Sequence, residues 1–495
     1  MKEIHHLVDG TGLMSTSGRT GPLYDPATGE RTGSVALASL AEVDAAIASS
    51  AAAFEGWSEV SLARRAKLMY EFRNLVVTRA DDLAQRLTAE HGKVMDDARG
   101  EVARGIENLE FACGIADALK GTHSEQASNG VDVYSVRRPL GVVAGITPFN
   151  FPAMVPMWMF PNAVACGNTF VLKPSERDPS APMLLAEIFQ EAGFPPGVLN
   201  VVNGDKEAVD RLVEHPDVKA VSFVGSTPIA RHVYASATAH GKRAQAMGGA
   251  KNHMVVLPDA DLDMAADAAV SAAYGSAGER CMAISVVVAV GDIGDQLVEA
   301  IRVRMEKLVI GPGTDPASEM GPLITAEARD RVAGYVQAGV DAGCRVVVDG
   351  REQQFDRDGF FLGVSLLDHV TTDMTVYTDE IFGPVLSVVR ADSYAEGVRL
   401  IRDNPYGNGA AIFTRDGGAA RQFQQDADAG MVGINVPIPV PVGYHSFGGW
   451  NDSAFGDHTI YGPEGIRFYT RPKVVTSRWP DPSTSTVDLG FPRND

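Results

Sequence analysis

The chain has 495 residues, too many for one ordinary hydrophobic core, so its length predicts two or three subdomains. Its 43 Lys and Arg residues stand against 63 Asp and Glu, a formal net charge of -20, which argues against a nucleic-acid or anionic-membrane surface. Four widely spaced cysteines without a C-x-x-C pair predict no disulfide framework and no metal site, and they favour a reducing, cytoplasmic setting.

The sequence predicts neither an export signal nor a membrane span. Its first six residues, MKEIHH, lack the apolar core of a signal peptide. The most apolar region, residues 140–172, is interrupted by four prolines, so we expect buried strand, loop and helix there.

The first part of the chain is predicted to be largely helical. Apolar residues recur at helical spacing over 41–54, and residues 62–88 and 96–119 each have the pattern of an amphipathic helix. Arg104 projects away from the apolar stripe of the last of these, and such an arginine usually faces water. The alternating residues 130–138 then predict an exposed strand or hairpin arm.

Strands and helices alternate after this arm. Continuous apolar strands between helices indicate a parallel, doubly wound α/β sheet, which binds ligands at the carboxyl ends of its strands. The usual G-x-G-x-x-G phosphate motif is absent. The predicted strands and helices alternate over residues 141–146, 153–165, 169–173, 181–192, 198–202, 206–214, 220–224 and 228–237.

The turn Gly225-Ser226-Thr227-Pro228 ends one of these strands and opens a helix. The glycine allows a ligand to approach closely, Ser226 and Thr227 are capping residues, and proline suits the first helical turn. Free N–H groups at such a helix start can hold a pyrophosphate. The alternative is an ordinary, well-capped helix without a ligand.

A second series of strands and helices predicts a separate layer. Its predicted elements span residues 253–257, 285–290, 294–305, 325–342 and 385–389. Residues 437–456 are predicted to be a long loop, residues 465–476 to be mostly β-strand, and the Pro- and Ser-rich 480–495 to be loosely held.

Cys281 follows an Ala-rich helical run at 264–277 and precedes a β-branched run at 285–290. A thiol at such a connection is accessible to a substrate, and the guanidinium of Arg280 beside it favours the nucleophilic thiolate. The alternative is an inert core cysteine, because free cysteines are among the most buried residues.

Five segments stand out in the chain: Thr147 to Pro152, Lys173 to Glu176, Phe223 to Ser226, Gly278 to Cys281 and Glu380 to Pro384. In their order and spacing they resemble the aldehyde dehydrogenase superfamily, and the resemblance covers about residues 24–478. It implies a homotetramer built as a dimer of dimers. The implied parts are a Rossmann-like NAD domain (1–120 and 140–249), an α/β catalytic domain (250–464), a β-strand oligomerisation arm (121–139 and 465–478) and a C-terminal tail (479–495).

The resemblance assigns roles to single residues. Cys281 matches the nucleophile, and Asn150 matches the amide that forms an oxyanion hole with the cysteine's backbone N–H; the alternative is that Asn150 only braces its loop. A carboxylate at Glu176 favours NAD over NADP because it repels a 2′-phosphate. The NAD positions implied are Lys173 and Glu176 at the adenosine ribose, Ser226 at the pyrophosphate and Glu380 at the nicotinamide ribose, with Phe382, Thr147, Phe149, Arg177 and Gly248 nearby.

Met247 marks a departure from the hydrolytic members of the superfamily. They usually have E-L-G-G-K here, whose Glu activates water, whereas this chain has M-G-G-A-K. Without that base a thiol, already partly ionised near neutral pH, is the better acyl acceptor, which favours coenzyme A. Residues 100–105, 158–161, 249–253 and 278–283 are similar to the CoA-acylating methylmalonate-semialdehyde (malonate-semialdehyde) dehydrogenase subfamily.

The subfamily resemblance implies that Arg104 and Arg280 hold a substrate carboxylate, which moves Arg104 from solvent into the site. The implied reaction is NAD-dependent oxidative decarboxylation of malonate or methylmalonate semialdehyde to acetyl-CoA or propionyl-CoA through a cysteine thioester. A hydrolytic enzyme that yields a free acid and a non-catalytic protein on the same fold are the alternatives. The preferred semialdehyde and the roles of Cys113, Cys166 and Cys344 are left open.

Overall fold

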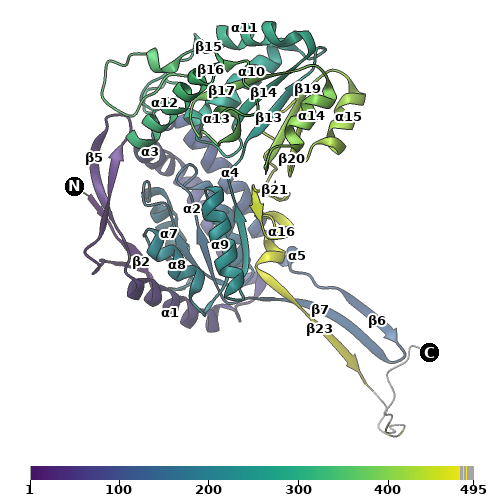
Figure 1. Cartoon of the computed structure of the whole chain (residues 1–495). Helices are drawn as coiled ribbons and strands as arrows, with labels where there is room; N and C mark the ends of the chain where they lie inside the picture. The colour runs from purple at the N-terminus through teal and green to yellow at the C-terminus, as the bar shows by residue number, and fades with distance from the viewer. Residues whose placement is uncertain (1, 480–482, 484–486, 488–495) are drawn as a thin grey trace.

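The chain forms two large sheets with a narrow arm that projects from the body (Figure 1). The structure is a computed structural model that describes residues 2–479, 483 and 487. Of the tail expected at 480–495, therefore, all but two residues lie outside the described part of the chain.

The first sheet has eight strands in the order β22-β12-β11-β8-β9-β10-β2-β3. Its central strands run parallel, and Ile146 pairs with both Lys173 and Phe223, so neighbouring carboxyl ends lie level at one edge. This confirms the predicted doubly wound sheet. Its strands are β2 (His6–Val8), β3 (Thr11–Leu13), β8 (Val142–Ile146), β9 (Thr169–Lys173), β10 (Leu199–Val201), β11 (Val218–Val224), β12 (Arg243–Met247) and β22 (Ala454–Phe455).

Helices bury both faces of this sheet. One core joins the sheet to α1, α8 and α9, and a larger core with many aromatic rings lies under α2, α6 and α7. The two long helices predicted at 62–88 and 96–119 are each broken, at Arg79 and at Gly114. The helices are α1 (Leu40–Trp57), α2 (Leu62–Thr78), α3 (Ala80–His91), α4 (Met95–Cys113), α5 (Ile115–Ala118), α6 (Met154–Ala165), α7 (Ser180–Glu191), α8 (Lys206–Glu214) and α9 (Thr227–Ala239).

The second sheet has seven strands in the order β15-β16-β17-β14-β13-β19-β20 and its own core of buried aliphatic residues. Its strands are β13 (Asn252–Val256), β14 (Ile284–Val290), β15 (Arg345–Val348), β16 (Ser365–Asp368), β17 (Val385–Ala391), β19 (Gly409–Phe413) and β20 (Met431–Ile434). Its helices are α10 (Leu262–Tyr274), α11 (Gly294–Met305), α12 (Ala326–Asp341), α13 (Thr375–Thr378), α14 (Tyr394–Arg402) and α15 (Gly417–Asp426), with 3₁₀ turns η1 (Gly275–Gly278), η2 (Gly291–Ile293) and η3 (Gly350–Glu352).

The chain passes directly from β12 at the carboxyl edge of the first sheet into β13 at the start of the second. The loop that follows η1 also enters the second sheet at this edge, where Asn252 pairs with Ile284. The ligand-binding edge of one sheet therefore meets the N-terminal edge of the other.

The arm is a three-stranded antiparallel sheet in the order β23-β7-β6 (Figure 1). Its strands are β6 (His123–Ser128), β7 (Val131–Pro139) and β23 (Thr470–Arg478). The prediction that 465–476 is mostly strand was wrong in its first part, because α16 (Gly462–Phe468) is a helix that buries Ile466 and Phe468 and only then gives way to β23. The short strand β21 (Trp450–Asn451), which lies in the loop predicted at 437–456, pairs with β18 (Tyr406–Gly407).

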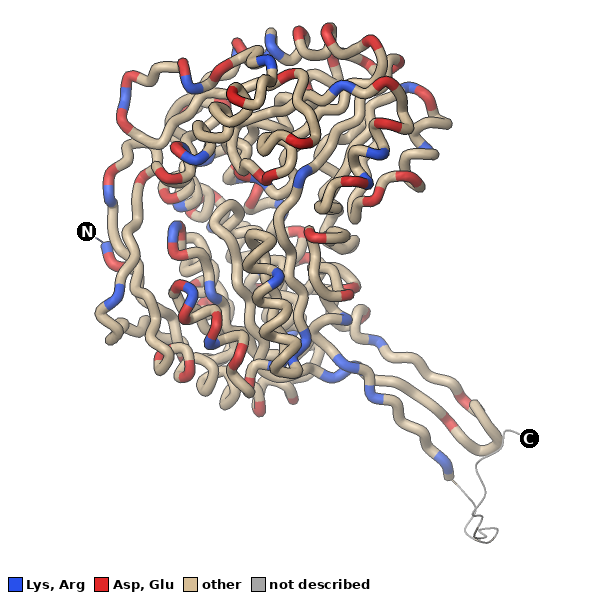
Figure 2. The backbone as a smooth tube through the Cα atoms, in the orientation of Figure 1, with Lys and Arg blue, Asp and Glu red and all other residues tan. Residues whose placement is uncertain are grey.

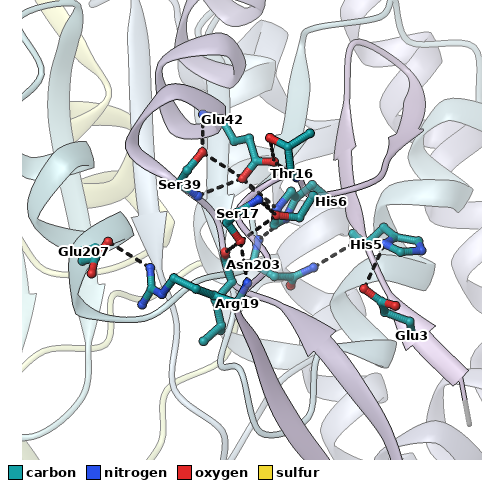
Figure 3. Close-up of polar contacts among 12 residues, drawn as sticks. Glu3, His5, His6, Thr16, Ser17, Arg19, Ser39, Glu42, Asn203 and Glu207 are labelled. Atoms are coloured by element: carbon teal, nitrogen blue, oxygen red, sulfur yellow. Dashed lines mark hydrogen bonds and ion pairs between the residues drawn. The ribbon is translucent and has the colours of Figure 1, made fainter.

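The N-terminal strands are fastened to the body by polar contacts (Figure 3). Glu42 in the first turn of α1 accepts hydrogen bonds from the backbone N–H of Thr16 (2.6 Å) and Ser39 (2.8 Å). The buried His6 accepts at Nδ1 from the Asn203 N–H (3.1 Å). The strands β1 (Lys2–Ile4), β4 (Thr20–Asp25) and β5 (Glu30–Ala36) form a small separate sheet.

Acidic and basic positions are interspersed over the body, and few of either lie on the strands at its centre (Figure 2). Among the described residues, no helix combines the length and apolar character that crossing a bilayer requires.

Candidate active site

Cys281 lies where two pockets meet. A larger pocket of about 650 Å³ runs along the carboxyl edge of the first sheet, and a smaller one of about 240 Å³ lies against α4 and α6. Cys281 lines both pockets. Ligands in either pocket would therefore lie beside Cys281.

A tight left-handed turn presents this cysteine. Ser276, Ala277 and Gly278 all have positive φ, at 54°, 51° and 74°. A Cβ atom at Gly278 would collide with the carbonyl oxygen of Gly383, so glycine is required there. Left-handed backbone at two non-glycine residues is strained, and such strain persists where the surroundings impose it, often at functional sites.

Two asparagine amides hold the backbone of the nucleophile. Asn252 Nδ2 donates to the carbonyl oxygens of Cys281 (2.9 Å) and Ala283 (2.9 Å), and Asn408 Nδ2 donates to Cys281 O at 3.1 Å. Asn252 Oδ1 in turn accepts from the Gly409 N–H (3.0 Å). The loop is thus tied to the starts of β13 and β19 in the second sheet.

Arg280 favours the Cys281 thiolate as expected, but burial of the thiol outweighs this effect in the ligand-free protein. Burial raises the pKa of the Cys281 thiol to about 12, and the carboxylate of Glu380 acts in the same direction. Arg280 donates its Nη2 to Asp97 at 2.6 Å, so a neighbouring carboxylate neutralises its charge. The thiol is protonated at neutral pH until a ligand or a base changes its surroundings.

Asn150 lies in the loop after β8, is buried, and lines the larger pocket together with Cys281. The backbone carbonyl oxygen of Asn150 accepts a hydrogen bond from Lys93 Nζ (2.7 Å). The structure therefore brings the two residues of the predicted oxyanion hole to one place.

The nine positions predicted for NAD all line the larger pocket: Thr147, Phe149, Lys173, Glu176, Arg177, Ser226, Gly248, Glu380 and Phe382. They come from the ends of several strands of the first sheet and from the segment before β17. The register of that sheet explains their convergence, because the carboxyl ends of its parallel strands lie level.

Three features of the pocket fit a dinucleotide. Ser226 is the N-cap residue of α9 but makes no side-chain cap bond, contrary to its predicted capping role, so the helix start keeps N–H groups for an anion. The buried Thr147 Oγ1 has no hydrogen-bond partner among the described residues. Lys173 Nζ lies 3.1 Å from the carboxylate of Glu176. Burial would raise the pKa of this carboxyl, but Lys173 lowers it, so the carboxylate stays ionised and can accept hydrogen bonds from ribose hydroxyls.

Glu380 and Phe382 close the pocket beside the cysteine. Glu380 Oε1 accepts from the Ala250 N–H (2.9 Å), and burial raises the pKa of Glu380 to about 7. Phe382 meets Phe149 edge to face, with ring centroids 5.8 Å apart. These contacts leave a carboxyl group that titrates near neutral pH next to the nucleophile.

The smaller pocket contains both predicted carboxylate-binding arginines. Arg104 is half-buried rather than solvated. Its guanidinium donates hydrogen bonds to the carboxylate of Glu107 (2.9 and 3.0 Å) and to the carbonyl oxygens of Val440 (2.9 Å) and Pro441 (3.3 Å). Arg280 enters the same pocket from the cysteine loop. The remaining wall is mostly apolar, and includes Phe151, Met154, Trp158, Ile438 and Phe447.

Met247, where a hydrolytic enzyme would carry its base, is the last residue of β12 and is buried. It pairs with Val224 and Ala454 and belongs to the apolar core of the first sheet. The position therefore provides no proton acceptor.

The sequence did not predict the residues that position the predicted site residues. Asp97 holds Arg280, Asn408 holds the cysteine backbone, and Lys93 with Glu101 holds the Asn150 loop. These partners are far apart in the chain, so no local spacing reveals them. Glu107 is different, because its place three residues after Arg104 in a helix is a visible signal of pairing.

Residues 13–475 match the aldehyde dehydrogenase family, which is nearly the whole chain. The chain belongs to this family. Among relatives of this aldehyde dehydrogenase, malonate-semialdehyde dehydrogenase from Pseudomonas aeruginosa is 55% identical over 496 residues, covering 99% of this chain and 100% of the relative. Malonate-semialdehyde dehydrogenase 3 from Geobacillus kaustophilus is 49% identical, with 97% of this chain and 99% of the relative covered.

Solved structures agree with this aldehyde dehydrogenase in fold. The methylmalonate-semialdehyde dehydrogenase of Oceanimonas doudoroffii has a TM-score of 0.96 and 52% identity, covering 98% of this chain and 99% of that one. A candidate methylmalonate-semialdehyde dehydrogenase from Sinorhizobium meliloti 1021, complexed with NAD, has a TM-score of 0.96 and 54% identity, covering 97% and 99%. The predicted aldehyde dehydrogenase fold is confirmed.

Proposed function

We propose that this aldehyde dehydrogenase oxidises malonate semialdehyde or methylmalonate semialdehyde with NAD and transfers the decarboxylated acyl group to coenzyme A. The observation that carries the proposal is the placement of Arg104 and Arg280 in the small pocket that Cys281 lines. Two guanidinium groups in a mostly apolar pocket, whose lining also includes Asp97 and Glu101, suit an aldehyde that carries a carboxylate. The semialdehyde dehydrogenase names of the relatives support the same substrate class.

The Cys281 thiol first loses its proton to solvent, and its sulfur then adds to the aldehyde carbon, which forms the oxyanion of a thiohemiacetal. Asn150 and the backbone N–H of Cys281 stabilise the negative oxygen. The nine residues of the larger pocket would hold NAD, which when bound would supply the hydride acceptor needed to form a thioester. The smaller pocket would take the aldehyde and the larger pocket the cofactor, and Cys281 lines both.

The thioester carries a carboxylate on its β carbon, and this arrangement permits loss of carbon dioxide. The electrons of the breaking carbon–carbon bond pass into the thioester carbonyl as an enolate, which the same oxyanion donors stabilise. Protonation of the enolate leaves an acetyl or propionyl group on Cys281. The thiol of coenzyme A then attacks the carbonyl carbon, and the Cys281 thiolate leaves.

Transfer to a thiol rather than to water follows from position 247. A buried methionine accepts no proton, so water has no base there, whereas a thiol ionises more readily than water. A hydrolytic enzyme that forms a free acid is the competing function.

The deciding experiment is an NAD-reduction assay with each semialdehyde, with coenzyme A present or omitted and the acyl products identified. We expect CoA-dependent turnover to acetyl-CoA or propionyl-CoA. Equal turnover into free acid without coenzyme A would establish the hydrolytic function instead. Absence of any NADH, together with a Cys281 that forms no acyl adduct in mass spectrometry, would identify a non-catalytic protein.

We further infer a homotetramer in a cytoplasmic, reducing compartment. Support for assembly comes from the arm, where the outer strand β23 leaves Val474 65% exposed. A reducing compartment preserves the catalytic thiol and the three buried free cysteines. Light scattering of the purified protein tests the tetramer.

A further inference from the structure

We propose that the buried ion pair between Lys93 and Glu101 is a positioning device that sets the geometry of the oxyanion hole. Lys93 lies in the connection between α3 and α4, and Glu101 lies in α4. Lys93 Nζ and Glu101 Oε2 are 2.6 Å apart, and neither side chain has solvent exposure. The inference rests on the proposed function, because it assigns these residues a role through Asn150.

The pair makes hydrogen bonds to both ends of the loop that carries Asn150. Lys93 Nζ also donates to the carbonyl oxygen of Asn150 (2.7 Å) and lies 4.5 Å from the ring centroid of Phe151. Glu101 Oε1 accepts from the N–H groups of Ala153 (2.8 Å) and Met154 (3.1 Å). Residues 150–154 are therefore fixed at their start by a cation and at their end by a carboxylate.

The Glu101 carboxylate also completes the start of α6. The N-cap residue Ala153 makes no side-chain cap bond, and Glu101 from another helix takes the free N–H groups instead. The helices α4 and α6 pack closely at Gly105, where a Cβ would meet the Met157 side chain, and this packing brings Glu101 near these N–H groups.

Stability alone does not explain such a pair. Removing two charges from water is costly, and apolar residues of similar volume often replace a buried ion pair without loss of stability. Unlike apolar packing, a charged pair with hydrogen bonds fixes the orientation of the backbone groups that it contacts. This orientation matters because Asn150 acts only if its side-chain amide points at the developing oxyanion. The Lys93–Glu101 pair contacts the Asn150 loop directly, and Glu101 also lines the smaller pocket together with Cys281.

The test compares two reactions of the same sulfur in Lys93→Met and Glu101→Gln. Acylation of Cys281 from an aldehyde needs the oxyanion hole, whereas alkylation of Cys281 by iodoacetamide forms no oxyanion. We expect Lys93→Met to lower the single-turnover rate of NADH formation by about 100-fold. Alkylation of Cys281, followed by peptide mass spectrometry, and NAD affinity should stay within about twofold. Glu101→Gln should show a smaller loss of the same selective kind.

Lys242→Met is the matched control. Lys242 is also buried and donates to backbone carbonyls, those of His215 and Val218, but it lies away from both pockets. Its substitution should lower the stability of the protein but leave the ratio of the Cys281 acylation rate to the Cys281 alkylation rate unchanged. Asn150→Ala, measured in parallel, separates the two proposals: if Asn150→Ala retains full activity, the oxyanion role itself is wrong.

The inference is overturned if Asn150→Ala is impaired while Lys93→Met oxidises aldehyde at close to the normal rate. It is equally overturned if acylation and alkylation fall together in the folded variants, since that pattern shows general disorder. Should neither Lys93→Met nor Glu101→Gln yield folded protein while Lys242→Met does, the pair serves folding and the positioning role is rejected.

Discussion

Arg280 and Asp97 form an ion pair 2.6 Å long in the wall of the pocket that Cys281 lines. The two residues are 183 positions apart, and the pair brings the cysteine loop and α4 together. The guanidinium that is expected to meet the substrate carboxylate is thereby held in place by a carboxylate of the protein, leaving its other nitrogens for the ligand.

Replacing Arg280 should affect carboxylated aldehydes selectively. Arg280→Leu removes a charge-assisted contact, so kcat/KM for malonate semialdehyde should fall by about 10- to 100-fold, while propanal should lose less than about threefold. Arg280→Leu/Asp97→Asn controls for the carboxylate left without its partner. Equal losses with both aldehydes, in the single and the double variant, would contradict the assignment. Steady-state NADH kinetics provide the measurement.

The reactivity of Cys281 should rise with pH without a plateau in the neutral range. Because burial raises the thiol pKa to about 12, the thiolate fraction of the ligand-free protein grows about tenfold per pH unit between pH 7 and 9. Iodoacetamide alkylation, followed by mass spectrometry of the Cys281 peptide, should reproduce that slope. A plateau below pH 8 would show a thiolate already formed.

Glu380 should oppose this ionisation. Its carboxylate adds to the effect of burial in raising the thiol pKa, so Glu380→Gln should alkylate several-fold faster at pH 8 than the unmodified protein. NAD binding should weaken in the same variant because the proposed ribose contact is lost. Slower alkylation, with the protein still folded, would reverse the predicted sign.

Much of the fold could be predicted because its signals are local. The helix α8 begins and ends at the residues expected from its apolar spacing, and β9 matches its predicted range 169–173. The helix α16 was missed because its sequence, G-P-E-G-I-R-F, has β-prone residues and only seven positions, and it is packing of Ile466 and Phe468 that decides its conformation. The break at Arg79 has no glycine or proline to announce it.

The site divides in the same way. Residues that carry chemistry, such as Cys281 and Asn150, stand in recognisable segments, so the sequence located them. Residues that position them, such as Asp97 and Lys93, act across the fold through buried pairs that only the packing of α4 reveals. The charge state of Cys281 was misjudged for a related reason, since burial outweighs the adjacent Arg280 and burial depends on the whole fold.

Ionisation of Glu42 should make the free energy of unfolding depend on pH. Burial alone would raise its pKa, but hydrogen bonds from Ser39 and Thr16 overcome this and lower it to about 2 from the ordinary 4.5. A depressed carboxyl pKa stabilises the folded state fully above pH 5, and this contribution disappears as the pH falls from 4.5 towards 2. Glu42→Gln should therefore cost about 2–3 kcal/mol at pH 7 and almost nothing near pH 2.

Urea unfolding at pH 7 and at pH 3, followed by circular dichroism, measures this difference. Glu3→Gln is a suitable control, since the Glu3 side chain is half-exposed and its carboxylate lies 3.8 Å from His5 Nδ1. A cost for Glu42→Gln that does not change between the two pH values would assign the loss to packing of the α1 start rather than to the carboxylate charge.

Restoring a carboxylate at position 247 should convert the enzyme partly into a hydrolase. Met247→Glu places a base at the end of β12, where the hydrolytic sequence pattern has one, so activated water should release the acyl group and NADH should form without coenzyme A. We expect the CoA-independent rate to rise about 10-fold or more, with free acid as product. Met247→Gln has the same shape without the charge and should stay CoA-dependent. Because Met247 is buried, both variants should lose similar stability, and a rise in free acid common to both would indicate a loosened site that admits water rather than a restored base.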